Sequence, residues 1–363
     1  MTFASRYSAF DRALHRIAFR MEPLQQAVAE IEDRIFHRCL ADIDDRTPVF
    51  ITALPRAGTT LLLELLAGLD EFAAHTYRNM PFVWIPMLWD RVSTPFRQPG
   101  CPQERAHRDG MLIDADTPEA LEEVIWRSYW PEHYDADRIR PWMELTKPEF
   151  QQAFASHLKK IIALNRMADS GRPWRYVSKN NLNIARIGLL RRSFAHATIL
   201  VAYRDPLAHA GSLLRQHLNF LELHRRDPFV RTYMDAIGHY DFGANLRPVD
   251  FGGWLDTTDA RDPTTLAFWV DYWVAAYASL IESAEQHPVC FVSHDALCRR
   301  PVETLERVAG LCGVNDVAGL VAKAPRIRHR GADGSGTQSC EPWRLERAYA
   351  VHAELERRSG DRR

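Results

Sequence analysis

One segment constrains the fold of this chain more than any other, because an apolar run, a tight loop and a leucine-rich helix follow one another over residues 48–68. The apolar run Val49–Leu54 has the length and composition of a buried strand. Pro55–Gly58 interrupts this run, and Thr59 opens the helix. Strand, loop and helix form the first half of a βαβ unit, which predicts a parallel sheet.

The same alternation of strand and helix resumes after residue 175. The expected strands are 176–178, 197–203 and 289–293, and the expected helices are 182–193, 207–221, 266–285 and 302–312. Such alternation predicts an α/β fold in which a mainly parallel sheet of about five strands has helices on both faces.

Segments without this alternation surround the expected core, and the whole chain 1–363 is expected to form one domain. The expected parts are a helical extension at 1–46, a core at 48–70 and 175–335, a helical insertion at 75–175, a Gly-, Pro- and Asp-rich connection at 222–263, and a C-terminal helix and tail at 343–363. The insertion is rich in Trp, Pro, His and Tyr and has little strand signal.

The overall composition excludes several classes of partner. Lys and Arg total 46 against 47 Asp and Glu, so no net field attracts nucleic acid or an anionic membrane. No run of about 18 apolar residues predicts a membrane span. The first residues lack the apolar core of a secretion signal, and the six cysteines show no zinc spacing. We therefore expect a cytoplasmic protein with reduced thiols and no metal.

The loop before the first helix is the strongest local signal of function. It consists of Pro55, Arg56, Ala57, Gly58, Thr59 and Thr60. Small residues allow backbone N–H groups to turn inward, and the positive end of the helix points at the same place. A guanidinium and two hydroxyls complete a cradle suited to a phosphate. The alternative is an ordinary strand-to-helix turn in which Thr59 is the N-cap.

A nucleoside triphosphatase loop is the competing interpretation of this segment. In that motif, a Gly stands where this chain has Ala53, and a Lys stands where it has Thr59. The strand 197–203 also leads to Arg204 rather than to a magnesium-binding Asp. A phosphoryl-transfer enzyme therefore remains as the second hypothesis.

The loop Pro55–Thr60 resembles the 5′-phosphosulfate loop of the PAPS-dependent sulfotransferase family, where PAPS is 3′-phosphoadenosine-5′-phosphosulfate. That loop has the pattern Pro-Lys/Arg-Ser-Gly-Thr-Thr, and Ala57 in place of Ser is a mild departure. A second similarity is a strand that ends in Arg204, followed eight residues later by Ser212. In the family, this pair binds the 3′-phosphate.

Two further segments are similar to the same family, in its bacterial type with a P-loop-like fold. Phe291–Pro301 has the family's pattern of a strand, an acidic residue and a Pro that opens a helix. The basic loop Arg328, Arg330 and Gly331 stands where relatives contact the 3′-phosphate. The resemblance implies in-line transfer of a sulfuryl group from PAPS to a hydroxyl or amine of a small-molecule, lipid or sugar acceptor, with PAP, adenosine 3′,5′-bisphosphate, as product.

Lys179, just past the end of an expected strand, is the candidate for stabilising charge on the bridging oxygen, together with Arg56. In many relatives, a Lys at this place is followed two residues later by a catalytic His, and here that position is Asn181. This departure keeps a third hypothesis open, in which the chain binds PAP and transfers nothing. A solvated lysine is the structural alternative for Lys179.

The general base must then come from elsewhere. Relatives of the bacterial and protein-tyrosine types use a Glu that follows the first βα unit, which implies Glu122 or Glu123 on a helix expected after Thr117. On that helix, Glu122 shares a face with Ile125, Trp126 and Tyr129, where desolvation raises a carboxyl pKa. Glu119 is expected to form a capping box with Asp116. His75, His107 and His133 are further candidate bases, and solvated helix charges are the alternative for both glutamates.

The resemblance implies that the insertion at 75–175 binds the substrate, because its aromatic-rich part, 75–145, stands where substrate loops occur in the family. Two aromatic segments, 77–84 and 268–277, are candidates for acceptor-binding surface, with core packing as the alternative. The loop-like stretch Gly238–Arg247 is a candidate lid. The sequence predicts neither the identity of the acceptor nor the oligomeric state.

Overall fold

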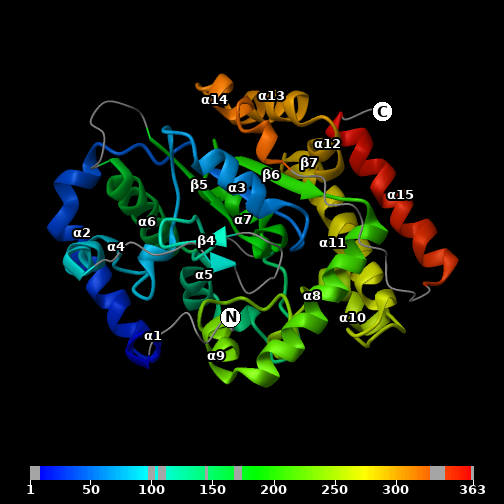
Figure 1. The fold of residues 1–363 in the computed structure, drawn as a ribbon, viewed down its shortest axis with the longest axis horizontal. Helices are drawn as coiled ribbons and strands as arrows, with labels where there is room; N and C mark the ends of the chain where they lie inside the picture. Colours follow the sequence, from blue (N-terminus) through cyan, green and yellow to red (C-terminus); the bar gives the residue numbers. More distant parts are fainter. Residues whose placement is uncertain are drawn as a thin grey trace.

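The structure is a computed structural model that describes residues 9–96, 103–104, 112–143, 146–166, 174–327 and 340–360. Its centre is a sheet of five parallel strands in the order β2-β5-β1-β6-β7. The strands are β1 (Val49–Thr52), β2 (Phe72–Ala73), β5 (Arg175–Lys179), β6 (Thr198–Tyr203) and β7 (Cys290–Ser293). Figure 1 shows these strands at the middle of the molecule, enclosed by helices.

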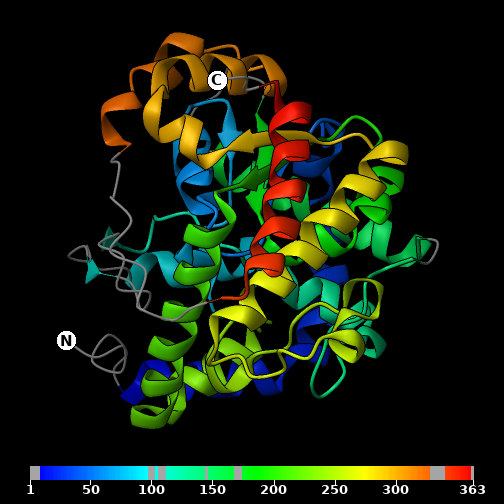
Figure 2. The same ribbon diagram turned by 90° about the vertical axis from the view of Figure 1, so that its right-hand side faces the viewer.

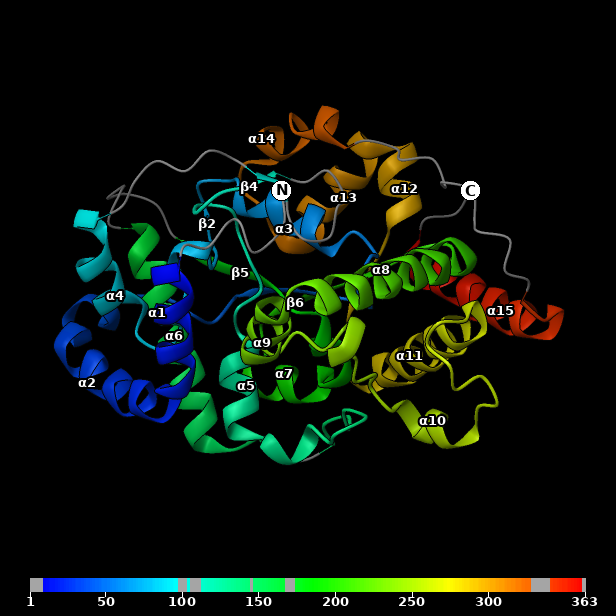
Figure 3. The same ribbon diagram turned by 60° about the horizontal axis from the view of Figure 1, so that its bottom comes forward.

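Both faces of the sheet are buried, which explains why its strands have no polar alternation. In β1, Val49 and Ile51 face one core cluster with Leu62 of α3 (Thr59–Ala67), whereas Phe50 faces the other. Figure 3 shows the helices on opposite sides of the sheet. On the first side lie α3, α12 (His294–Arg299), α13 (Pro301–Cys312) and α14 (Val317–Val321), and on the second α6 (Pro148–Arg166), α7 (Ile187–Ser193) and α11 (Leu266–Gln286). The predicted α/β fold class is confirmed.

The outer helices pack on this core. The N-terminal helix α2 (Glu22–Ala41) lies beside α6, where the buried Lys160 Nζ is 2.9 Å from Glu32 Oε2, and α1 (Ala9–Arg20) packs against α9 (Pro228–Ala236). Figure 2 shows α15 (Pro342–Ser359) running alongside α11, and α8 (Pro206–Arg226) packs against both helices. No helix within the described ranges is long and apolar enough to cross a bilayer.

Several element boundaries differ from the sequence predictions. The helix expected after Thr117 begins only at α5 (Glu123–Tyr129), because residues 114–117 form a turn and Pro118 then pairs with Thr76 of the segment after β2. There, Tyr77 N donates to Thr117 O and Glu119 N donates to His75 O. These backbone bonds hold the chain out of helical geometry for several residues.

In two more segments, the observed secondary structure differs from the predicted one. The helix expected at 182–193 is a 3₁₀ turn (Asn181–Ala185) and then α7, with non-helical Arg186 between them. The connection expected at 222–263 holds the end of α8, as well as α9 (Pro228–Ala236) and the short α10 (Trp254–Thr257). The insertion also contains α4 (Pro86–Ser93) and a two-stranded ribbon, β3 (Gln103–Glu104) and β4 (Leu112–Ile113), which the sequence did not indicate.

Candidate active site at the carboxyl edge of the sheet

The loop after β1 has a backbone shape that only a few residues tolerate. Arg56 has φ of 74°, and Gly58 has φ of 90° and precedes α3 as its N-cap. A left-handed non-glycine residue costs about 1–2 kcal/mol and is typical of functional loops. At Gly58, an added Cβ would lie 2.6 Å from Cδ2 of His294, so both the conformation and the packing require glycine. The loop therefore has the tight, small-residue geometry that the sequence predicted.

His209 of α8 forms a hydrogen bond with the backbone of this loop. Its Nε2 lies 2.8 Å from Pro55 O, and its Nδ1 accepts a hydrogen bond of 3.1 Å from Trp273 Nε1. The neutral tautomer with the proton on Nε2 therefore fits both partners. Burial above all, together with the charges of Arg204, His294 and Arg56, lowers the pKa of His209 to about 3. Three basic side chains thus converge on the loop.

Arg204 and Ser212 belong to the same strand–helix unit, on either side of the turn from β6 into α8. Arg204 directly follows β6, and Asp205 caps α8 by accepting from Ala208 N at 2.8 Å. Ser212 on that helix is 8% exposed, and Arg56 Nε donates to its Oγ at 3.5 Å. The alternatives of an Arg204–Asp205 salt bridge and a solvent-facing Ser212 are therefore not observed among the described residues.

The Nε atom of Arg204 is buried and has no hydrogen-bond partner within the part of the chain that the structure describes. An unsatisfied buried donor is costly, and in native proteins it often marks the place of a ligand or an ion. Its charge acts on His209 and His294, which both contact the loop, so an anion is the ligand that fits best.

Lys179 ends β5 beside Ile51 of β1, on the same edge of the sheet as the loop. The carboxylate that faces it is Glu119, which also accepts hydrogen bonds from Tyr77 Oη and Ala120 N. Burial alone would raise the pKa of Glu119, but Lys179, His239 and these hydrogen bonds lower it by more. Glu119 is thus an ionised carboxylate at the carboxyl edge, and no capping box with Asp116 forms, since Asp116 pairs with Arg78.

The two glutamates predicted as bases lie deeper in the protein. Glu122 is fully buried and accepts a hydrogen bond of 2.6 Å from Tyr176 Oη, and burial raises its pKa as the sequence indicated. Glu123 is 2% exposed and forms a buried ion pair with Arg186. Its carboxylate also accepts from Asn180 Nδ2 at 2.7 Å. Neither side chain is exposed to a substrate, which argues against both predicted roles.

The loop 238–247 closes over these glutamates. A Cβ on Gly238 would lie 2.5 Å from Glu123 Cγ, and His239 Nε2 lies 3.2 Å from Ala120 O. Asn181, which stands where many relatives have a catalytic His, donates from Nδ2 to Asp241 Oδ2 at 3.0 Å. The candidate lid is therefore tied to the carboxyl edge of the sheet by side chains of the site.

The other predicted histidine bases are structural. His75 and His157 form a fully buried stacked pair with 2.8 Å between their Nε2 atoms, and burial lowers the pKa of His75 to about 4. His133 is buried and stacks on Trp142 at 4.6 Å between ring centroids. His107 and the predicted phosphate contacts Arg328, Arg330 and Gly331 lie outside the described residues.

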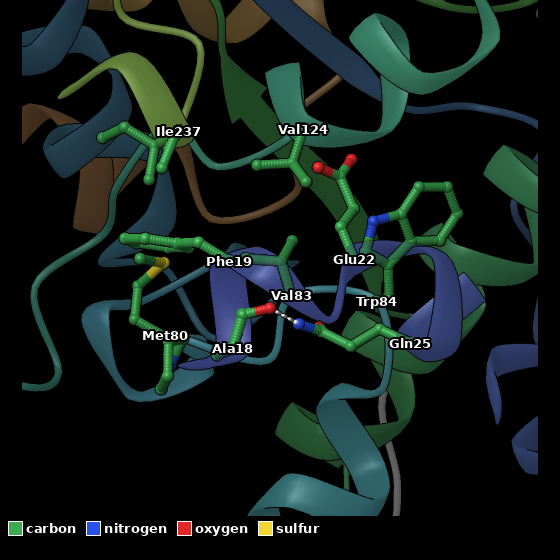
Figure 4. Close-up of a pocket in the computed structure, with 11 residues that line it drawn as sticks. Ala18, Phe19, Glu22, Gln25, Met80, Val83, Trp84, Val124 and Ile237 are labelled. Carbon is green, nitrogen blue, oxygen red and sulfur yellow. Dashed lines mark hydrogen bonds between the residues drawn. The ribbon is translucent and has the colours of Figure 1, made fainter. Parts of the chain in front are cut away.

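Of the aromatic segments, 268–277 lies in the core, where Trp269, Trp273 and Tyr277 are fully buried. The segment 77–84 contributes to a small, mainly apolar pocket. Figure 4 shows Met80, Val83 and Trp84 facing Phe19, Val124 and Ile237 around this pocket. Buried Trp84 Nε1 and Gln25 Oε1 have no hydrogen-bond partner among the described residues, so the pocket also offers one donor and one acceptor.

The parallel sheet, the tight loop with its basic neighbours, and the lysine and carboxylate beside it define a transferase-type site for an anionic substrate. The sequence profile of the sulfotransferase family matches residues 48–246, which cover β1, the loop, β5, β6 and α8. This chain belongs to the sulfotransferase family.

Solved structures give a distant likeness over most of the chain. Sulfotransferase STF9 from Mycobacterium avium is 14% identical, with a TM-score of 0.47 over 91% of this chain and 80% of that chain. Sulfotransferase STF1 from Mycobacterium tuberculosis H37Rv is 13% identical, with a TM-score of 0.46 over 96% and 86%. The sulfotransferase domain from the curacin biosynthetic pathway is 14% identical, with a TM-score of 0.40 over 87% and 99%. No curated protein matches the sequence.

Proposed function

We propose that this protein transfers the sulfuryl group of PAPS to an acceptor hydroxyl or amine by in-line displacement. The observation that carries the proposal is the convergence of Arg56, Arg204 and Ser212 around a glycine-dependent loop at the carboxyl edge of the sheet. PAPS has anionic groups at two ends, and the site offers basic groups from two separate strand ends.

The chain's residues fit such a donor on two structural grounds. Gly58 lets the loop turn tightly beneath the His294 ring into the start of α3, where backbone N–H groups and the helix end attract a phosphate. Arg204 Nε is a buried donor that lacks a partner in the described structure, and a 3′-phosphate held with Ser212 Oγ would satisfy it. We assign the loop 55–60 to the 5′-phosphosulfate and the Arg204–Ser212 pair to the 3′-phosphate.

Within this proposal, Lys179 and Arg56 stabilise the negative charge that develops on the bridging oxygen as the S–O bond breaks. We assign the general base to Glu119 rather than to Glu122 or Glu123. Glu119 is partly exposed and faces Lys179, whereas the other two carboxylates are enclosed in the core. Its ionised carboxylate takes the proton of the acceptor as the acceptor oxygen or nitrogen attacks sulfur.

The surroundings of Glu119 indicate the kind of acceptor. Its hydrogen-bond partner Tyr77 begins the segment that leads to the pocket of Figure 4, and Val124 and Ile237 from the neighbouring segments complete that wall. We therefore propose a small acceptor whose reactive hydroxyl or amine is attached to an apolar group.

The test is transfer of ³⁵S-labelled sulfuryl groups from PAPS to a panel of aliphatic alcohols, phenols, amines and sugars. The proposal predicts a labelled product with at least one apolar alcohol, phenol or amine, and its loss with Glu119→Gln. Retention of all label in PAPS across the panel, although the protein binds PAP, would instead support the non-catalytic hypothesis.

A further inference from the structure

His294 lies where the two parts of the donor site meet. It directly follows β7, and because Ser293 pairs with Tyr203 in the sheet, His294 stands beside Arg204 at the carboxyl edge. Its ring contacts Gly58 so closely that Cδ2 would lie 2.6 Å from an added Cβ there. The side chain remains 20% exposed, so the ring is accessible to a ligand in the loop.

The charged and titratable groups around this ring come from three elements. On α12 itself, Asp295 Oδ1 lies 3.7 Å from His294 Nδ1, and Cys298 Sγ lies 3.8 Å from Nε2. Arg204 faces the ring from the end of β6, and His209 faces it from α8. Burial and Arg204 lower the pKa of His294, but Asp295 and Cys298 raise it by more, so the net shift is upward.

The neighbouring Asp295 also connects this corner to the 3′ side of the site. Its Oδ2 accepts a hydrogen bond of 2.8 Å from Asp205 N, the residue between Arg204 and α8. His294 therefore contacts the loop at Gly58, and the adjacent Asp295 contacts Asp205 in the turn that follows Arg204.

We infer that His294 is a further donor-binding residue, whose protonated imidazole faces an anionic group of the nucleotide across Gly58. The inference rests on the proposed function, because it assigns His294 to the same donor site. Without an anion, His294 and Arg204 repel each other, and a bound phosphate or phosphosulfate converts this repulsion into attraction for both groups.

Such a contact couples donor binding to proton uptake. An anion beside His294 favours the protonated ring, so the pKa of His294 is higher in the complex than in the free protein. The contact therefore contributes its full binding energy at a pH below the pKa that His294 has in the free protein. This contribution is lost as the pH rises through the higher pKa that His294 has in the complex. Each unit of upward shift corresponds to a tenfold gain in affinity.

The experiment measures the Kd of PAP by calorimetry between pH 6 and pH 9 for the wild type, His294→Gln and His294→Lys. The ligand's own phosphates titrate near pH 6 in every sample, so the ratio of two Kd values cancels that effect. His37→Gln, at an exposed position of α2, is the matched control. We expect the Kd ratio of His294→Gln to wild type to fall from about tenfold at pH 6 towards one at pH 9. For His294→Lys, the ratio to His294→Gln stays constant, because lysine remains charged.

A ratio that is the same at every pH, whether large or equal to one, would overturn the inference, since it would show packing against Gly58 or no role at all. Failure of the wild type to bind PAP at any pH would instead overturn the proposed function. Thermal unfolding of each variant shows whether a loss of affinity reflects loss of folded protein.

Discussion

Replacing Arg204 by alanine separates the proposed role in binding from a role in folding. In the free protein, Arg204 Nε is buried without a hydrogen-bond partner among the described residues, and its charge acts against His294 and His209. Removing an unsatisfied buried donor relieves a cost of about 1–3 kcal/mol, which offsets the packing that the side chain provides. The free energy of unfolding of Arg204→Ala should therefore fall by less than about 1 kcal/mol or rise.

The effect on nucleotide binding should be much larger. A hydrogen bond from a guanidinium to a phosphate is worth about 1.5–3 kcal/mol, and each 1.4 kcal/mol is tenfold in Kd. Loss of one such bond predicts that PAP binds about 10- to 150-fold more weakly to Arg204→Ala, and loss of a bidentate contact predicts more.

The assay is titration calorimetry with PAP, alongside urea unfolding of the same samples. Arg225→Ala is the matched control, because Arg225 is exposed at the far end of α8 and pairs only with Glu222 in the described structure. An unchanged Kd would refute the assignment of Arg204 to the 3′-phosphate. A higher Kd would also refute it if the free energy of unfolding falls by as much as the free energy of binding.

Three further outcomes follow from the buried charges. Glu119→Gln should lower kcat by about 100-fold or more while the Kd of PAP stays within about twofold, and full turnover of the variant would place the base elsewhere. Because the pKa of Glu119 is lowered, wild-type kcat should fall with acid only below pH 4.5. Glu123→Gln should lower the free energy of unfolding by about 3–5 kcal/mol, since it leaves the Arg186 guanidinium buried without its carboxylate, and a urea midpoint like that of the wild type would contradict this. His209 has its pKa lowered from 6.5 to about 3, so the unfolded chain binds its proton first and stability is lost as the pH falls below 6.5. This loss amounts to about 2 kcal/mol between pH 7.5 and pH 5, and the slope should be shallower in His209→Gln.

Much of the core could be predicted because local and global signals agree there. The strands β1, β5, β6 and β7 are short apolar runs bounded by turn residues, and each begins and ends within two residues of its prediction. β2 is only two residues long and has no pattern of its own, because pairing with β5 alone makes it a strand.

The insertion was harder to predict, since long-range contacts determine its structure. Backbone bonds of Thr117 and Glu119 to the segment after β2 hold the chain out of helical geometry, although the sequence Thr-Pro-Glu has the pattern of a helix start. The resulting shift of the helix start to Glu123 exposes Glu119 to the site and turns Glu122 and Glu123 inward. Only the structure could distinguish these carboxylates.

The donor site shows both the strength and the limit of sequence reasoning. Arg56 and Ser212 lie far apart in the sequence, yet they were assigned to one sheet edge, where they now form a hydrogen bond. His294 was missed, although its place directly after a strand gave the same signal as Arg204. A lone histidine after a strand is too common to stand out before its contact with Gly58 is known.

Stabilisation by nucleotides tests the account most directly. Thermal unfolding of the wild type is compared with PAP, ADP and ATP–magnesium at equal concentrations. A ligand present at 100 times its Kd adds about 2.7 kcal/mol to the free energy of unfolding, which is a clear shift in Tm. We predict that PAP raises the Tm by more than ADP does, and that ATP–magnesium does not raise it. Stabilisation by ATP–magnesium alone, or by none of the three, would contradict it.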